Sequence, residues 1–136
     1  MKVFRAIDTA GSALTAHRVL LDTIAENLAN VNTTRTGEGG PYRRKIPVFS
    51  EIMKDASGGS GGVSVMEIAQ DDSPPRVVHE PGHPDADEDG CVAYPNVSVV
   101  REMADMVAAS RAYEANLEVV ESARAMWDAA TELLRG

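Results

Sequence analysis

The chain has 136 residues, which is room for one modest domain or for two long helices with a small insert. Its formal net charge of -8 argues against a nucleic-acid partner, because phosphate backbones are bound by clustered Lys and Arg. The single cysteine, Cys91, excludes an intrachain disulfide. Aromatic side chains make up only 4% of the residues, too few to dominate a core, so we expect a component of an assembly.

The N-terminal residues do not resemble a cleavable signal peptide. Arg5, Asp8 and Arg18 interrupt the stretch where such a peptide has a continuous apolar core. No apolar run approaches the roughly 18 residues that cross a membrane. We therefore expect any export to follow a route that needs no such peptide.

The first predicted element is an N-terminal helix over residues 1–31. Apolar positions recur at alternating spacings of four and three, with His17 as the one polar exception, which is the heptad pattern of a coiled coil. These positions are Val3, Ile7, Ala10, Leu14, His17, Leu21, Ile24, Leu28 and Val31. Asp22 and Glu26 are on the opposite, polar face. Asn30 and the Gly-rich segment that follows end the helix.

The middle region, residues 32–96, has a different composition. Short β-type segments are predicted at 42–49, 63–68, 76–80 and 91–94, and frequent prolines favour edge strands and turns. Residues 55–62, DASGGSGG, are typical of a flexible linker. We expect an extended, β-containing insert here.

The last predicted element is a helix over residues 97–136, where good helix formers dominate. Its apolar positions again step by three and four, with one shortened step from Val120 to Ala123. They are Met103, Met106, Ser110, Tyr113, Leu117, Val120, Ala123, Trp127, Ala130 and Leu134. The predicted fold is therefore mainly α, with the two terminal helices paired as a coiled coil around a small β-containing middle.

An acidic loop between His83 and Asn96 is the basis for the main alternative function, calcium binding. Asp85, Asp87 and Asp89 alternate before Gly90, as in the start of an EF-hand calcium loop. Asn96 stands where the loop needs a bidentate Glu, and the prolines on both sides exclude the flanking helices. A solvated turn is the simpler interpretation, and a calcium-responsive binding module is the alternative.

Cys91 raises two further possibilities. It could bind a metal ion together with His79 and His83, but the spacing matches no recurrent zinc pattern. It could act as a nucleophile beside His83, in a small thiol enzyme. A buried or interface cysteine is the simpler interpretation, and we expect no catalytic residue, metal or cofactor.

Four stretches resemble bacterial flagellar rod and hook proteins. SALTAHRVLLDTIAENLANVNTT (residues 12–34) resembles their N-terminal signature. GPYRRK (40–45), SPPRVVHEPGHPDADEDGCVAYPNV (73–97) and ASRAYEANLEVVESARAM (109–126) narrow the resemblance to the proximal rod members. The chain departs from that pattern at His17, where Gln is usual, and at Cys91, where an aromatic residue is common.

The resemblance implies a structural subunit of the proximal rod of the flagellar basal body. Such a subunit assembles helically with copies of itself and other rod proteins, transmits motor torque across the periplasm, and is exported by the flagellar type III apparatus. No nucleic acid or small-molecule substrate is implied.

Two sets of residues carry these expectations. The predicted assembly interface consists of Ile7, Leu14, Leu21, Ile24, Leu28, Met103, Met106, Tyr113, Leu117, Val120 and Trp127. The positions that match the family motifs are Asn27, Ala29, Asn30, Tyr42, Arg43, Arg44, Pro81, Gly82, His83, Pro84, Asp85, Asp87, Asp89, Gly90, Arg111, Tyr113 and Asn116.

Overall fold

The computed structural model describes residues 2–53 and 61–136. Its elements, in chain order, are α1 (Lys2–Ala29), β1 (Lys45–Ile52), β2 (Gly62–Gln70), β3 (Arg76–His79), β4 (Cys91–Tyr94) and α2 (Val99–Arg135). A mainly helical chain with a small strand-containing middle is therefore confirmed. Most of the predicted linker lies outside the described residues, and its last residue, Gly62, belongs to β2.

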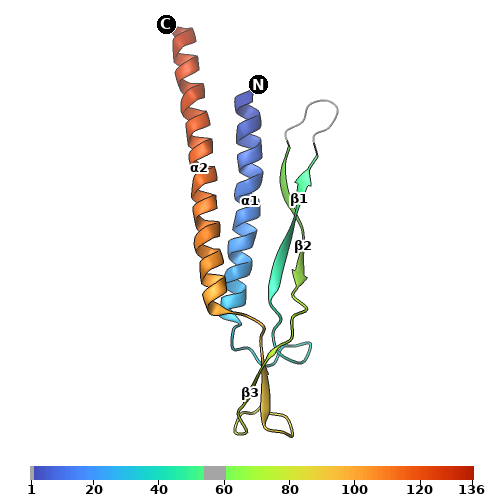
Figure 1. Ribbon diagram of the computed structural model, residues 1–136. Helices are drawn as coiled ribbons and strands as arrows, with labels where there is room; N and C mark the ends of the chain where they lie inside the picture. The colour runs from blue at the N-terminus through green and yellow to red at the C-terminus, as the bar shows by residue number, and fades with distance from the viewer. Residues whose placement is uncertain (1, 54–60) are drawn as a thin grey trace.

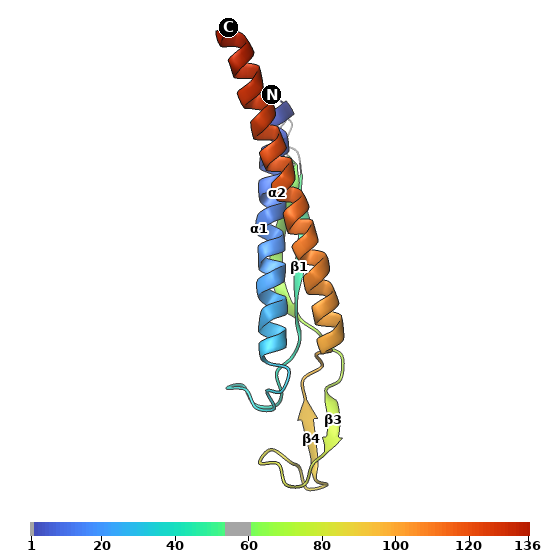
Figure 2. The same ribbon diagram turned by 90° about the vertical axis from the view of Figure 1, so that its left-hand side faces the viewer.

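The molecule is elongated, with α1 in the middle. Figures 1 and 2 show α2 packed along one side of α1 and the β1–β2 hairpin along another. The two helices run in opposite directions, so both chain ends lie at the same end of the molecule. β3 and β4 form a second antiparallel pair at the other end.

The apolar heptad of α1 is the face that the fold covers. Ala10 and Ile24 are buried, and Ile7, Leu14, Leu21 and Leu28 are half-buried. Near the free end of the helix pair, the rings of Phe4 and Trp127 meet with their centroids 4.9 Å apart. Burial of these side chains is the main favourable contribution to packing α1 in place.

The covered face of α2 agrees with the predicted one at several positions and departs from it at others. A series of buried and half-buried positions steps regularly by four and three, without a shortened step: Glu102, Met106, Ala109, Tyr113, Asn116, Val120, Ala123 and Trp127. Asp105, Ser110, Ala112 and Thr131 are half-buried as well. Met103, Leu117, Ala130 and Leu134, which were predicted for the same seam, are exposed instead.

The β1–β2 hairpin is attached to α1 by a close approach. Ser12 Oγ accepts a hydrogen bond from the Val63 backbone N–H over 3.1 Å, and the Thr9 hydroxyl donates to the Gly61 carbonyl oxygen over 2.7 Å. A Cβ on Gly62 would lie 2.5 Å from Ser12 Oγ, so a larger residue here would have to displace that hydroxyl. The hairpin therefore lies directly on the helix surface.

The start of α2 is set by local polar groups. Ser98 is the N-cap, and its hydroxyl accepts from the Arg101 N–H over 3.5 Å. At the other end the Gly136 N–H donates to the Glu132 carbonyl oxygen over 3.2 Å. Within the described residues, neither helix combines the length and apolar character that spanning a membrane requires.

Candidate functional site

A buried asparagine joins both helices to the start of β1. Asn27 is 1% exposed, and its Nδ2 donates to the Lys45 carbonyl oxygen over 2.9 Å and to Glu102 Oε2 over 3.2 Å. Its Oδ1 accepts from the Tyr42 hydroxyl over 2.8 Å and from the Lys45 backbone N–H over 2.9 Å. Both donors and both acceptor positions of the amide are used. Asn27 thereby fixes how α1, α2 and β1 meet.

Glu102 provides the buried charge beside it. This side chain is 0% exposed, and Arg44, whose side chain is 16% exposed, donates from Nε to Glu102 Oε1. The Arg44 guanidinium also lies 3.6 Å from a carboxylate oxygen of Asp71 and 3.6 Å from one of Asp105. A buried ion is tolerated only when it is paired and hydrogen-bonded, and here both conditions are met.

Asn96 extends these contacts to the base of the β3–β4 pair. Its Oδ1 accepts from the Arg44 backbone N–H over 2.8 Å, and its Nδ2 donates to the carbonyl oxygens of Asp71 and Ser73 over 3.1 and 3.0 Å. We call Asn27, Tyr42, Arg44, Asn96 and Glu102 the polar cluster. It lies where the helices, the hairpin and the β3–β4 pair converge.

Two ionisable groups, one in the polar cluster and one beside it, have shifted pKa values. Burial, followed by the negative charges of Glu26 and Glu102, raises the pKa of Tyr42 to about 12. Hydrogen bonds from the Ser73 side chain and backbone lower the pKa of Asp71, with a further contribution from Arg44. Tyr42 is therefore held as a hydrogen-bond donor and Asp71 as a carboxylate.

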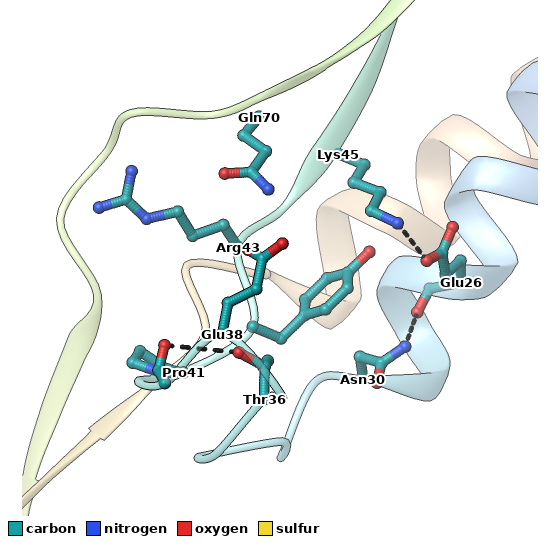
Figure 3. Close-up of a pocket in the computed structure, with 10 residues that line it drawn as sticks. Glu26, Asn30, Thr36, Glu38, Pro41, Arg43, Lys45 and Gln70 are labelled. Carbon is teal, nitrogen blue, oxygen red and sulfur yellow. Dashed lines mark hydrogen bonds and ion pairs between the residues drawn. The ribbon is translucent and has the colours of Figure 1, made fainter.

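A polar cavity of about 530 Å³ opens beside the cluster. Its lining side chains come from the end of α1, the loop before β1 and the two strands, as Figure 3 shows. Lys45 points to Glu26 and pairs with it, and Tyr42 is among the residues that line the cavity. Charges of both signs line the cavity, because Glu38 and Arg43 are also present.

An apolar groove of about 360 Å³ lies on the side of the cluster nearer α2. His17, Leu20 and Ile24 of α1 contribute to it, with Ile46 and Pro47 from β1 and Ala108, Ala109 and Ala112 from α2. His17 Nδ1 is buried and has no hydrogen-bond partner within the described residues. His17, where the family pattern usually has Gln, therefore lies in this groove.

Two carboxylates of the acidic loop, those of Asp85 and Asp87, are already engaged by other groups of the protein. The Asp85 carboxylate accepts from the Thr34 hydroxyl over 2.8 Å and pairs with Arg35 over 2.6 Å. Asp87 Oδ1 accepts from the backbone N–H groups of Asp89 and Cys91 over 3.0 and 2.7 Å. Over residues 2–53 and 61–136, no group of three or more His, Cys, Asp or Glu side chains is placed to hold a metal ion. The geometry gives the calcium alternative no support.

Gly90 closes this loop with a backbone conformation that favours glycine. Its φ is +73°, and a Cβ there would lie 3.0 Å from Pro81 Cγ and 3.1 Å from His79 Cε1. Cys91 Sγ lies 3.9 Å from His79 Nδ1, whereas the His83 ring lies against Tyr94. The structure thus brings His79 to the cysteine, and not His83 as the thiol-enzyme alternative required.

The remaining motif residues lie in different parts of the structure, outside the polar cluster. Asn30 ends α1, where its Nδ2 donates to the Glu26 carbonyl oxygen over 2.9 Å, and Ala29 beside it is exposed. On α2, Asn116 donates to the Ala112 carbonyl oxygen over 2.8 Å and Tyr113 is half-buried, while Arg111 is exposed. Arg43 is exposed near Asp72. Pro81, Gly82, His83 and Pro84 form the loop after β3.

The predicted interface residues separate into two groups. Ile24 is buried, and Ile7, Leu14, Leu21, Leu28, Met106, Tyr113, Val120 and Trp127 are half-buried on the facing helices. Met103 and Leu117 lie on the outside of α2. Glu102 and Asn96 were missed as site residues. Glu102, Ala109, Asn116 and Ala123 follow one another at a spacing of seven residues, and this spacing could have placed Glu102 on the covered face of α2.

Known proteins match nearly the whole chain. The family described as "Flagella basal body rod protein" matches residues 7–35, and the family described as "Flagellar basal body rod FlgEFG protein C-terminal" matches residues 88–133. The flagellar basal-body rod protein FlgC of Borreliella burgdorferi is 40% identical, with 100% of both chains covered. FlgC of Bacillus subtilis is 40% identical over 98% of this chain and 99% of its own, and FlgC of Salmonella typhimurium is 42% identical over 93% of each. The chain therefore belongs to the FlgC family of flagellar basal-body rod proteins.

Proposed function

We propose that the chain is a structural, non-catalytic subunit that builds the proximal rod by helical assembly with copies of itself and with other rod proteins. It transmits motor torque across the periplasm and reaches the rod through the flagellar type III export apparatus. The family supports the role, since its relatives are named flagellar basal-body rod proteins. The elongated shape suits a subunit that must contact neighbours along its length.

An exposed apolar stripe on α2 is the observation that carries the assembly proposal. Met103 is 56% exposed, Val107 53% and Leu117 42%, and their spacing places them on one side of the helix. Large apolar side chains exposed on one side of a helix are candidates for contact with another protein. The contact with α1 uses the neighbouring face of α2, so this stripe remains available for another subunit.

The pairing of α1 with α2 supports a role in transmitting torque. On both helices a series of covered positions steps by four and three, the pattern with which coiled-coil helices interdigitate. We propose that α1 and α2 pair as a coiled coil, which supplies the stiffness that torque transmission demands. The polar cluster, at one end of the helix pair, then connects the two helices to the β1–β2 hairpin and to the β3–β4 pair.

The test separates folding from assembly. Met103→Asp and Leu117→Asp, singly and together, place charges on an exposed face, so the free energy of unfolding should change by only about 0.5 kcal/mol. In cells that lack their own copy, the double variant should be secreted normally and still fail to build rods. Electron microscopy of purified basal bodies and swimming assays provide the readout.

Glu118→Lys is the matched control, because Glu118 is exposed on the same helix outside the stripe. Its carriers should build rods and swim. Secretion must be measured for every variant, because an export defect would also abolish swimming. Normal rods in the double variant would contradict the proposed contact surface.

A further inference from the structure

The β3–β4 end of the molecule is attached to the rest mainly through loops. β3 and β4 pair with each other and contact no other helix or strand of the described residues. Figures 1 and 2 show the pair projecting beyond the end of the helices. We call residues 74–95 the tip. Its angle to the helices is therefore not set by packing between elements.

One attachment lies at Asn96, where the chain enters and leaves the tip. This side chain hydrogen-bonds to Asp71 and Ser73 on the entering segment and to Arg44 beside the helices. Pro74, Pro75 and Pro95 fix φ at three positions of the two crossings, so a change of angle must be absorbed by the other residues there. Asn96, which links the two crossings and belongs to the polar cluster, is the candidate pivot.

The other attachment is the Asp85 carboxylate. Thr34 donates to Oδ2 over 2.8 Å and Arg35 pairs with Oδ1 over 2.6 Å, so both oxygens reach across to the loop after α1. That loop is itself held, because the Tyr42 N–H donates to the Thr33 carbonyl oxygen over 3.0 Å. Asp85 therefore joins the far side of the tip to a fixed part of the molecule.

We propose that the tip is a hinged unit that pivots at Asn96, and that the contact of Asp85 with Thr34 and Arg35 is a clasp that sets its angle. The Arg35 side chain is 74% exposed, and ion pairs of this kind are weak and screened by salt. The clasp therefore opens more readily than the pivot, where Asn96 is half-buried and makes three hydrogen bonds. An adjustable tip would let the subunit fit different neighbours. That consequence rests on the proposed assembly, whereas the hinge itself does not.

The angle between the tip and the rest of the molecule can be followed as the distance between two spin labels, one on each part. In a Cys91→Ser background, spin labels are placed at Glu67→Cys on β2 and Asp89→Cys on the tip, both exposed positions. Double electron–electron resonance at low salt should give a narrow distance distribution for the clasped protein. Asp85→Asn should shift and broaden it. Arg35→Gln, which leaves Thr34 in place, should do so less, and high salt should act like Arg35→Gln.

Glu88→Gln is the matched control, since it removes the same charge from the same loop at an exposed position. It should leave the distribution unchanged. A second label pair within the tip, at Val77→Cys and Asp89→Cys, should also stay unchanged in Asp85→Asn. The proposal is overturned if Asp85→Asn leaves the first distance unaltered, if Glu88→Gln broadens it equally, or if the distance within the tip broadens as well.

Discussion

Asn27 and Glu102 are 75 residues apart in the chain, and they meet through a hydrogen bond of 3.2 Å between Asn27 Nδ2 and Glu102 Oε2. Each comes from a different helix, and both are almost completely buried. Arg44, from the segment before β1, neutralises the glutamate. The contact therefore specifies which ends of the two helices lie together, as buried polar residues do when they set the register of paired helices.

Removing the glutamate should damage the fold severely. Glu102→Ala leaves Arg44 without its main partner and Asn27 with an unpaired donor. Breaking a buried ion pair in this way costs about 3–5 kcal/mol. Urea unfolding followed by circular dichroism measures the loss. Glu118→Ala, an exposed change on the same helix, should stay within about 0.5 kcal/mol. Equal effects of the two changes would show that the cluster contributes little to stability.

The sequence predicted α1 better than α2, for a physical reason. On α1 most covered positions are apolar, with Ser12, His17, Thr23 and Asn27 as the polar ones, so the heptad is visible as hydrophobicity. On α2 the covered positions include Glu102, Ala109 and Asn116, which are polar or small, while Met103 and Leu117 beside them are larger and exposed. Hydrophobicity alone therefore selected Met103 and Leu117 in place of their covered neighbours Glu102 and Asn116, although it identified Met106, Tyr113, Val120 and Trp127 correctly.

The polar cluster could be predicted only in part. The family motifs contain Asn27, Tyr42 and Arg44, but nothing in one sequence pairs them with Glu102 or Asn96, because those contacts are long-range. The four strands were predicted close to their observed positions from β-type residues between prolines and glycines. Their separation into two pairs depends on α1 covering only one of them, which periodicity does not reveal.

Alkaline pH should destabilise the fold through Tyr42. The raised pKa means that the folded protein keeps the phenol protonated where the unfolded chain, with a pKa near 10.0, has ionised it. This contribution to stability is fully present below pH 10 and is lost as the pH rises through the folded value of about 12. The difference in unfolding free energy between wild type and Tyr42→Phe should therefore shrink over that range.

Tyrosinate absorbance provides the direct check. The titration of wild type minus that of Tyr42→Phe isolates this phenol, and its midpoint should lie well above the usual value. A midpoint at the ordinary tyrosine pKa would contradict the burial of the Tyr42 hydroxyl beside Glu26 and Glu102.

Two glycine substitutions should act in opposite directions. Gly11 lies inside α1, and a Cβ there meets nothing within 4 Å, so Gly11→Ala should stabilise the isolated subunit by about 0.5–1 kcal/mol. At Gly62 the new Cβ would displace Ser12 Oγ, which accepts from the Val63 N–H. Gly62→Ala should therefore cost about 1 kcal/mol or more. Thermal unfolding of both variants measures this, and a stabilised Gly62→Ala would contradict the close contact of hairpin and helix.

Charges in the covered seam of α1 should destabilise the fold and abolish the rod. Leu21 and Leu28 are half-buried on this face, and an unpaired carboxylate placed there by Leu21→Asp or Leu28→Asp costs several kcal/mol. Each subunit of a rod repeats the defect, so cells that carry either variant should form no rods and should not swim.

Asp22→Ala is the control for these two variants, because Asp22 is exposed, whereas Glu26 pairs with Lys45 and is less suitable. It should change stability by about 0.5 kcal/mol or less and leave swimming intact. The purified seam variants should unfold at lower urea concentration than wild type, unlike Met103→Asp and Leu117→Asp, which should lose rods while keeping their stability. If Leu21→Asp or Leu28→Asp cells still build rods and swim, the pairing of α1 with α2 is not what holds the subunit in the rod.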